Sequence, residues 1–186
     1  MVLSLLILIA NLTPLYQSAG LIKVQVNESI EMLIPGDFRP MTNDEIADRY
    51  FTTKRPMALF TDPGSSIDLG VNKSVTQWNE KDLVIMKSFQ KSNIYSLYDN
   101  IEMLSEGIKE VKGRQYAYFE FISTVKEDEN VFVRKGSISK YTYIQYTIIK
   151  DQSLVFNFTC PTRVHNNWKD NVIKIMSSME VSKNFK

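Results

Sequence analysis

Long segments in which apolar and polar residues alternate, separated by very short turns, constrain the fold of this chain more than any other feature. Ala117, Phe119 and Phe121 alternate with polar and tyrosine neighbours, which is the period of a β-strand with two different faces. Strands joined by turns of two or three residues run antiparallel. The sequence therefore predicts two long hairpins, formed by residues 100–111 with 115–125 and by residues 138–149 with 153–160.

Three helices are indicated by local signals. Thr42 and Glu45 form a capping box, in which each side chain accepts a hydrogen bond from the other's backbone, and the helix that they start runs to about Phe51. Asn79 caps a second helix, in which Leu83, Met86, Phe89 and Leu97 recur at approximately helical spacing and are predicted to face the sheet, while the polar residues 88 and 90–92 face out. The third helix is the clearest, because one of its faces carries Trp168, Val172, Ile175, Met176 and Met179.

The remaining elements are short strands near the N-terminus. Residues 21–26 and 29–34 form a strand pair or one bent strand, and residues 57–61 and 66–71 form a hairpin whose turn contains Pro63. The chain then reads as strands, helix, hairpin, helix, four strands and helix. This order predicts a mostly antiparallel sheet with helices covering its faces.

The N-terminal segment has the pattern of an export signal. Residues 1–20 carry no charged side chain, and the apolar run Val2–Ala10 is far shorter than the roughly 20 residues that span a bilayer. Ser18 and Gly20 fit cleavage after Gly20, although no Lys or Arg precedes the run. The alternative is a buried N-terminal strand or helix. We expect a signal peptide over residues 1–20 and export to the periplasm or beyond, without stable membrane insertion after cleavage.

Composition excludes several classes of function. The chain has 22 Lys and Arg against 21 Asp and Glu, so it offers no surplus of positive charge for nucleic acid or an anionic membrane. Its single cysteine and single histidine rule out an internal disulfide and most metal sites. It contains no phosphate-binding glycine loop and no dinucleotide fingerprint. We therefore predict no metal and no cofactor. Residues 21–186 contain neither a linker nor a repeat and are predicted to form one domain.

A small basic group follows the first predicted helix and is the one candidate surface site. Arg49, Lys54 and Arg55 lie close together in the sequence and would suit an anion or an acidic partner. The alternative is an ordinary solvated helix end, where cations complement the helix dipole.

Two other groups of residues have both a functional and a structural interpretation. Cys160 and His165 would serve a Cys–His hydrolase, but Cys160 shares a strand face with apolar residues, which favours a core cysteine and a surface histidine. Tyrosines gather on neighbouring predicted strands, where they suit a recognition surface but are buried by default in a covered sheet. They are Tyr116, Tyr118, Tyr141, Tyr143 and Tyr146.

The order of elements and several hydrophobic segments resemble the PsbP-like superfamily over roughly residues 28–182. The segments are Ile46–Tyr50, residues 58–62 with 69–71, residues 113–117 and the closing helix at Trp168. The resemblance implies an α/β/α sandwich, an α/β fold of the α+β kind with a mostly antiparallel sheet of about six to seven strands flanked by helices. It also implies a non-enzymatic accessory or assembly domain that acts by contact, and it supplies no site residues.

The predicted function is therefore that of an exported binding or assembly accessory domain with a protein partner. One alternative is a periplasmic module that holds a small apolar or lipid-like molecule between sheet and helix, which requires a pocket on the order of 300 Å³ or more. A remote alternative is the Cys–His hydrolase, which requires Cys160 and His165 to be within hydrogen-bond reach and partly exposed.

Overall fold

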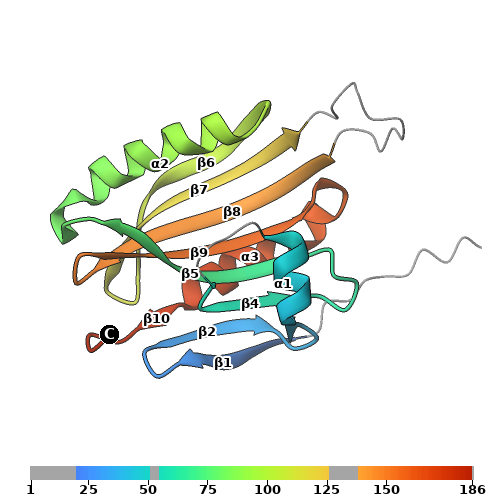
Figure 1. Ribbon diagram of the computed structural model, residues 1–186, viewed down its shortest axis with the longest axis horizontal. Coiled ribbons are helices and arrows are strands. Elements are labelled where there is room, and N and C mark those ends of the chain that lie inside the picture. The colour runs from blue at the N-terminus through green and yellow to red at the C-terminus, as the bar shows by residue number, and fades with distance from the viewer. Residues whose placement is uncertain (1–19, 51–54, 126–137, 186) are drawn as a thin grey trace, which may run out of the picture.

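The computed structural model describes residues 20–50, 55–125 and 138–185 (Figure 1). Its helices are α1 (Asn43–Arg49), α2 (Leu83–Leu97) and α3 (His165–Ser178). Its strands are β1 (Leu21–Asn27), β2 (Ile30–Pro35), β3 (Arg39–Pro40), β4 (Ala58–Thr61), β5 (Asp68–Gln77), β6 (Asn100–Val111), β7 (Arg114–Val125), β8 (Ile138–Ile149), β9 (Gln152–Pro161) and β10 (Glu180–Val181).

A seven-stranded sheet in the order β3-β4-β5-β9-β8-β7-β6 forms the centre of the molecule, and all its neighbouring strands are antiparallel. The predicted mostly antiparallel sheet of six to seven strands flanked by helices is confirmed. A second sheet has the order β1-β2-β10. The predicted strand pair over residues 21–26 and 29–34 is confirmed as β1 and β2. The third strand was not anticipated: β2 also pairs with the two-residue strand after α3, which no local pattern marks.

Both long hairpins turn through two residues with positive φ. Lys112 and Gly113 have φ of 50° and 76°, and Lys150 and Asp151 have φ of 50° and 59°. Positive φ at both central residues matches the right-handed twist of the flanking strands, which is why such turns close hairpins. The predicted hairpins are confirmed, and their tight turns fix which side chains share each face of the sheet.

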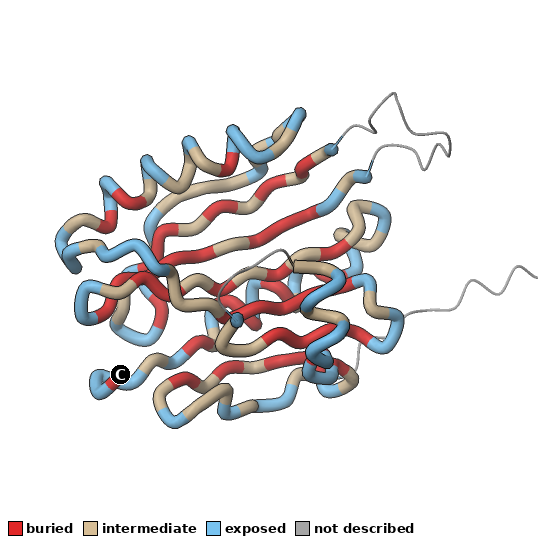
Figure 2. The backbone as a smooth tube through the Cα atoms, in the orientation of Figure 1, coloured by how far each residue is buried: buried red, intermediate tan, exposed pale blue. Residues whose placement is uncertain are grey.

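The two faces of the sheet are covered by different elements. Alternate residues such as Tyr116 and Phe156 pack with α3 and β2, whereas Phe119 and Phe121 on the opposite face pack under α2. Figure 1 shows α3 behind the strands and α1 in front of β4 and β5. Buried residues therefore follow the central strands, while the outer sides of α1 and α2 are exposed (Figure 2). This is an α/β/α arrangement.

The last helix packs as its pattern predicts. Trp168 is 2% exposed and contacts the rings of Phe38 and Phe158, each at 5.5 Å between centroids. The other four predicted apolar positions of this face are completely buried.

The second helix differs from its prediction. Leu83 and Met86 are buried, but Phe89 is 46% exposed and Leu97 is 69% exposed. The predicted burial of these two residues is wrong, because α2 lies on the outer strands and buries only a narrow stripe that also includes Ile94. Asn79 caps a short 3-10 turn that leads into α2.

Several expectations lie outside the described residues. One is the predicted signal peptide, of which only Gly20 is described. Another is Lys54 of the predicted basic group. No helix in the described ranges is both long and apolar enough to cross a membrane.

Candidate functional site

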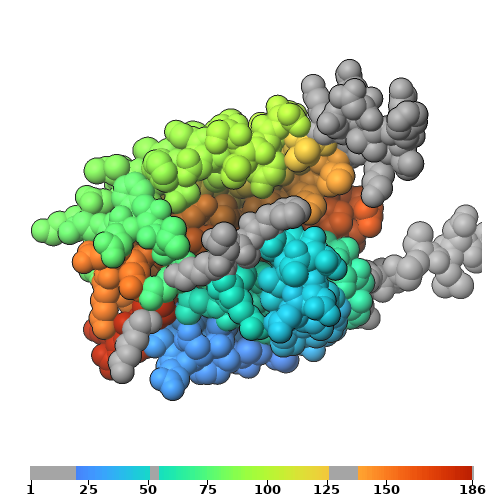
Figure 3. Space-filling view, viewed as in Figure 1, coloured from blue at the N-terminus to red at the C-terminus, as the bar shows by residue number. Residues whose placement is uncertain are grey.

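An open cleft of about 590 Å³ lies on the face of the main sheet that carries α1 and α2. In the space-filling view the strands are recessed between the two helices (Figure 3). The cleft is lined by Arg49, Tyr50, Asp68, Ile94, Leu97, Tyr98, Phe121, Ser123, Val125, Ile138, Lys140, Thr142, Ile144, Tyr146, Asn157 and Thr159. Its charged, polar and apolar residues are segregated, and this segregation determines what it can bind.

The floor of the cleft grades from charged to aromatic across four strands. Asp68 on β5 pairs in register with Thr159 on β9, which pairs with Thr142 on β8. Thr142 in turn pairs with Phe121 on β7. Paired residues point to the same face, so a carboxylate, two hydroxyls and a phenyl ring form one row.

The next row of the floor contains an amide that the fold leaves accessible. Asn157 on β9 lies between Gly70 on β5 and Ile144 on β8. A Cβ atom at Gly70 would collide with Oδ1 of Asn157, so the missing side chain makes room for the amide. Within the described part of the chain this amide has no hydrogen-bond partner, and the hydroxyls of Thr142 and Thr159 have only a weak mutual contact at 3.4 Å. The floor therefore retains capacity for hydrogen bonds.

The end of the cleft near α1 is a closed polar network around Asp68. Nη2 of Arg49 donates to both carboxylate oxygens of Asp68, at 2.8 and 2.6 Å, and the Tyr50 hydroxyl donates to Oδ2 at 2.8 Å. Thr61 donates to Oδ1 at 3.1 Å. Burial, followed by the charge of Asp68, raises the pKa of the Tyr50 hydroxyl. The network fixes the position of α1, because α1 has no buried residue of its own.

The opposite wall of the cleft is apolar and comes from the C-terminal end of α2. Ile94, Leu97 and Tyr98 form it, and the ring of Tyr98 packs on that of Phe121 at 6.0 Å between centroids. Burial raises the pKa of the Tyr98 hydroxyl. The exposed Leu97 therefore forms the rim of this apolar wall.

The predicted basic group is only partly placed by the structure. Arg49 lines the cleft, but its charge is already balanced by Asp68. Arg55 is exposed and makes no ion pair with any described residue. Lys54 lies outside the described residues. Lys140, which the sequence did not single out, is a second cation among the described residues that line the cleft.

Cys160 and His165 lie on the other face of the sheet, away from the cleft. The Cys160 side chain is completely buried, and burial raises the pKa of its thiol to about 12, which disfavours the nucleophilic thiolate. The ring of His165 stacks on Tyr141 at 4.1 Å, and its buried Nε2 has no partner among the described residues. The partial exposure that a Cys–His hydrolase requires of Cys160 is not met.

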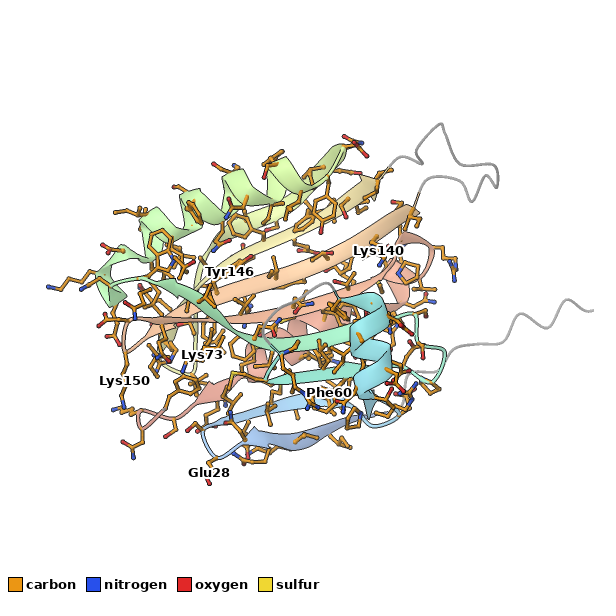
Figure 4. The ribbon with its side chains drawn as sticks, in the orientation of Figure 1. Glu28, Phe60, Lys73, Lys140, Tyr146 and Lys150 are labelled. Carbon is orange, nitrogen blue, oxygen red and sulfur yellow. The ribbon has the colours of Figure 1, made fainter. Side chains whose placement is uncertain are left out.

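The predicted tyrosines are mostly core residues. Four of the five are buried, and Tyr118 is half-buried. Tyr146 alone among them lines the cleft, at the position labelled beneath α2 in Figure 4. Within the ranges that the structure describes, no group of three or more His, Cys, Asp or Glu side chains is placed to hold a metal ion.

Fold and cleft together define an α/β/α domain with an open, partly polar groove on one face. No family model matches the chain, and no curated protein is similar to it in sequence. Its fold is nevertheless similar to that of solved structures. Cyanobacterial PsbP from Synechocystis has a TM-score of 0.55 at 13% identity, over 88% of this chain and 93% of that one.

Two further structures share the fold. LpqN, which is involved in cell envelope biogenesis of Mycobacterium tuberculosis, has a TM-score of 0.55 at 10% identity, over 88% of this chain and 91% of that one. The Ran-binding protein Mog1p of Saccharomyces cerevisiae has a TM-score of 0.54 at 12% identity, over 88% of this chain and 96% of that one. The chain therefore has the PsbP-like fold, as its sequence predicts, and likeness at these identities concerns the fold alone.

Proposed function

We propose that this protein is an exported, non-enzymatic binding domain that serves as an accessory or assembly factor by contact with a partner protein. The observation that carries the proposal is the cleft. It combines an apolar wall with an Asn157 amide that has no hydrogen-bond partner among the described residues and with two threonine hydroxyls that make only a weak mutual contact. Such a combination is typical of recognition sites, where apolar surface supplies affinity and a few polar groups fix orientation.

Two further observations support the proposal. The uncharged, short apolar leader over residues 1–20 favours export to the periplasm or the medium. The proteins of similar fold include one described as Ran-binding and one involved in cell envelope biogenesis. Arg49, Lys54 and Arg55 remain part of the proposal as a basic group for an acidic partner. Of the three, Arg49 lines the α1 end of the cleft, where it pairs with Asp68.

The test is a crosslinking pull-down from the envelope of the organism that makes the protein, read by mass spectrometry. Three tagged forms are compared: the wild type, Thr159→Trp, which fills the floor of the cleft, and Lys169→Trp on α3, behind the sheet. We expect one reproducible partner with the wild type and Lys169→Trp that is lost with Thr159→Trp. Retention of the partner by a Thr159→Trp protein with an unchanged melting temperature would contradict the proposal.

A second candidate function is the binding of a small apolar or lipid-like molecule. The volume of about 590 Å³ favours it, because this exceeds the roughly 300 Å³ at which ligand pockets begin. Native mass spectrometry of the protein purified from its own host distinguishes the two. A bound small molecule in place of a protein partner, absent from Thr159→Trp, would replace the first proposal by the second.

A further inference from the structure

The cleft is matched in length, hydrogen bonding and charge to a short extended peptide. We propose that its occupant is a peptide segment of the partner protein with a large apolar side chain and a carboxylate within two positions of it. This inference rests on the proposed function and specifies which part of the partner is bound.

The length of the floor sets the size of the segment. The row from Asp68 to Phe121 crosses four neighbouring strands. Strands lie about 4.8 Å apart, so the row is about 14 Å long, and an extended chain covers that distance in about four residues at about 3.3 Å each. A segment of this size lies in the groove while the rest of the partner stays outside it.

The polar groups of the floor favour a peptide over a hydrocarbon chain. An acyl chain laid across the cleft would remove water from the Asn157 amide and from the Thr142 and Thr159 hydroxyls without replacing its hydrogen bonds, which is unfavourable. A peptide backbone offers a donor and an acceptor at every residue. It therefore satisfies these groups when it displaces the water.

The two ends of the cleft determine the side chains. The wall of Ile94, Leu97 and Tyr98 provides an apolar surface for one large side chain. Among the described residues that line the cleft, the charged ones are Arg49, Asp68 and Lys140, two cations and one anion, and Asp68 already pairs with Arg49. Lys140 is exposed and makes no ion pair with a described residue. A carboxylate of the bound segment is its complement.

Lys140 lies next to the apolar end rather than next to Asp68. It pairs in register with Ser123 on β7, two residues along the strand from Phe121. The acidic residue of the peptide must therefore lie close in sequence to the apolar residue, which is why we propose a separation of at most two positions.

The test uses capped six-residue peptides of Gly and Ser that carry one Phe and, two positions later, Glu, Gln or Lys. Binding is measured by ¹⁵N chemical-shift titration of the mature protein. We expect the Phe/Glu peptide to bind best, with shifts concentrated on cleft residues. Loss of one hydrogen bond, in Asn157→Leu or the isosteric Thr142→Val, should weaken binding of this peptide about tenfold.

The charge is tested with a matched pair of lysines. Lys140 and Lys150 lie toward opposite ends of β8, and only Lys140 lines the cleft (Figure 4). Lys140→Gln should remove the preference for Glu over Gln, about two- to fivefold for an exposed ion pair, and Lys150→Gln should not.

Three results would overturn the inference: equal binding of the three peptides, shifts that map to the α3 face, or no binding at millimolar concentration. Binding of a fluorescent hexadecanoate that depends on Asn157, with no peptide binding, would also overturn it in favour of an apolar ligand. The first three outcomes leave the pull-down result untouched: a protein partner that is captured by the wild type and lost with Thr159→Trp would still support the proposed function. Failure of the peptide chemistry is therefore distinguishable from failure of the proposed function.

Discussion

At the scale of single residues, Lys109 shows how burial changes the chemistry of one group. Its Nζ donates to the hydroxyl of Tyr143 at 3.0 Å and lies within 5.6 Å of the centroids of two stacked rings, Tyr118 and Tyr143. Burial lowers the pKa of Lys109 to about 8, and the charge of Glu120 only partly opposes this effect. The folded protein therefore holds this proton less tightly than the unfolded chain does.

The consequence is a pH dependence of stability with a definite sign. Between about pH 8 and the ordinary lysine pKa of 10.5, the unfolded chain binds more protons at this position than the folded protein, so the contribution of Lys109 to stability rises with pH. We expect the free energy of unfolding of the wild type to increase relative to that of Lys109→Met from pH 8 to pH 10.5. Urea unfolding of both proteins across this range measures it, and a difference that is flat or falls with pH would contradict the assignment.

Cys160 gives a second expectation at this scale. Because its thiol is completely buried and burial raises its pKa to about 12, iodoacetamide should leave it unmodified in the folded protein at pH 8 and modify it fully in denaturant. Mass spectrometry of the intact protein reads both states. Rapid modification of the folded protein would mean that the thiol is accessible and would revive the hydrolase hypothesis.

At the scale of elements, α1 is held by polar contacts rather than by burial. Its start is the predicted capping box, in which Thr42 accepts from the Glu45 backbone at 3.2 Å and Glu45 accepts from the Thr42 backbone at 2.9 Å. Its end is tied to β5 through Arg49 and Asp68. The capping box has a local signature in the sequence, whereas the tie to β5 has none.

Asp68→Asn tests this tie. The substitution removes the charge that Arg49 and Tyr50 contact, and we expect a loss of about 1.5–3 kcal/mol in the free energy of unfolding, the range for hydrogen bonds to a charged group. Asp151→Asn in an exposed turn is the matched control and should change stability by less than about 0.5 kcal/mol. Equal effects of the two substitutions in urea unfolding would show that the network does not stabilise the fold.

Helix α3 is held by burial. Trp168→Ala should cost about 3–5 kcal/mol of unfolding free energy, because it leaves a large cavity between Phe38 and Phe158. Lys169→Ala, at the exposed neighbouring position, should have little effect. Urea unfolding compares them, and a loss below about 1 kcal/mol for Trp168→Ala would mean that the helix packs differently.

The difference between α2 and α3 shows what the sequence can and cannot predict about elements. Both long hairpins and α3 are marked by local patterns, and they are where the sequence places them. The burial of Phe89 and Leu97 was predicted wrongly, because the helical period says which residues share a face but not how many strands lie beneath it. Phe89 packs instead on Trp78, at 5.5 Å between ring centroids.

At the scale of the whole molecule, the cleft exists because two helices cover one face of the sheet incompletely. Its floor combines Asp68, Thr142 and Asn157 from three strands, and their proximity depends on strand order and register. The sequence does show Asn157 and Thr159 on the strand face opposite the apolar one, which is a trace of the site. It does not show that β5 pairs with β9, and so the site could not be assembled from the sequence.

The central claim is that the protein binds its partner through the cleft and not through another face. The most direct test places a photo-crosslinking amino acid at Leu97, on the exposed rim of the cleft, and, in a separate protein, at Ile173 on α3, which is 48% exposed behind the sheet. Both proteins are irradiated in the envelope of their host, and adducts are identified by mass spectrometry. We expect one dominant adduct from position 97 and none from position 173. The same adduct from position 173 alone, or equally from both, would contradict the claim.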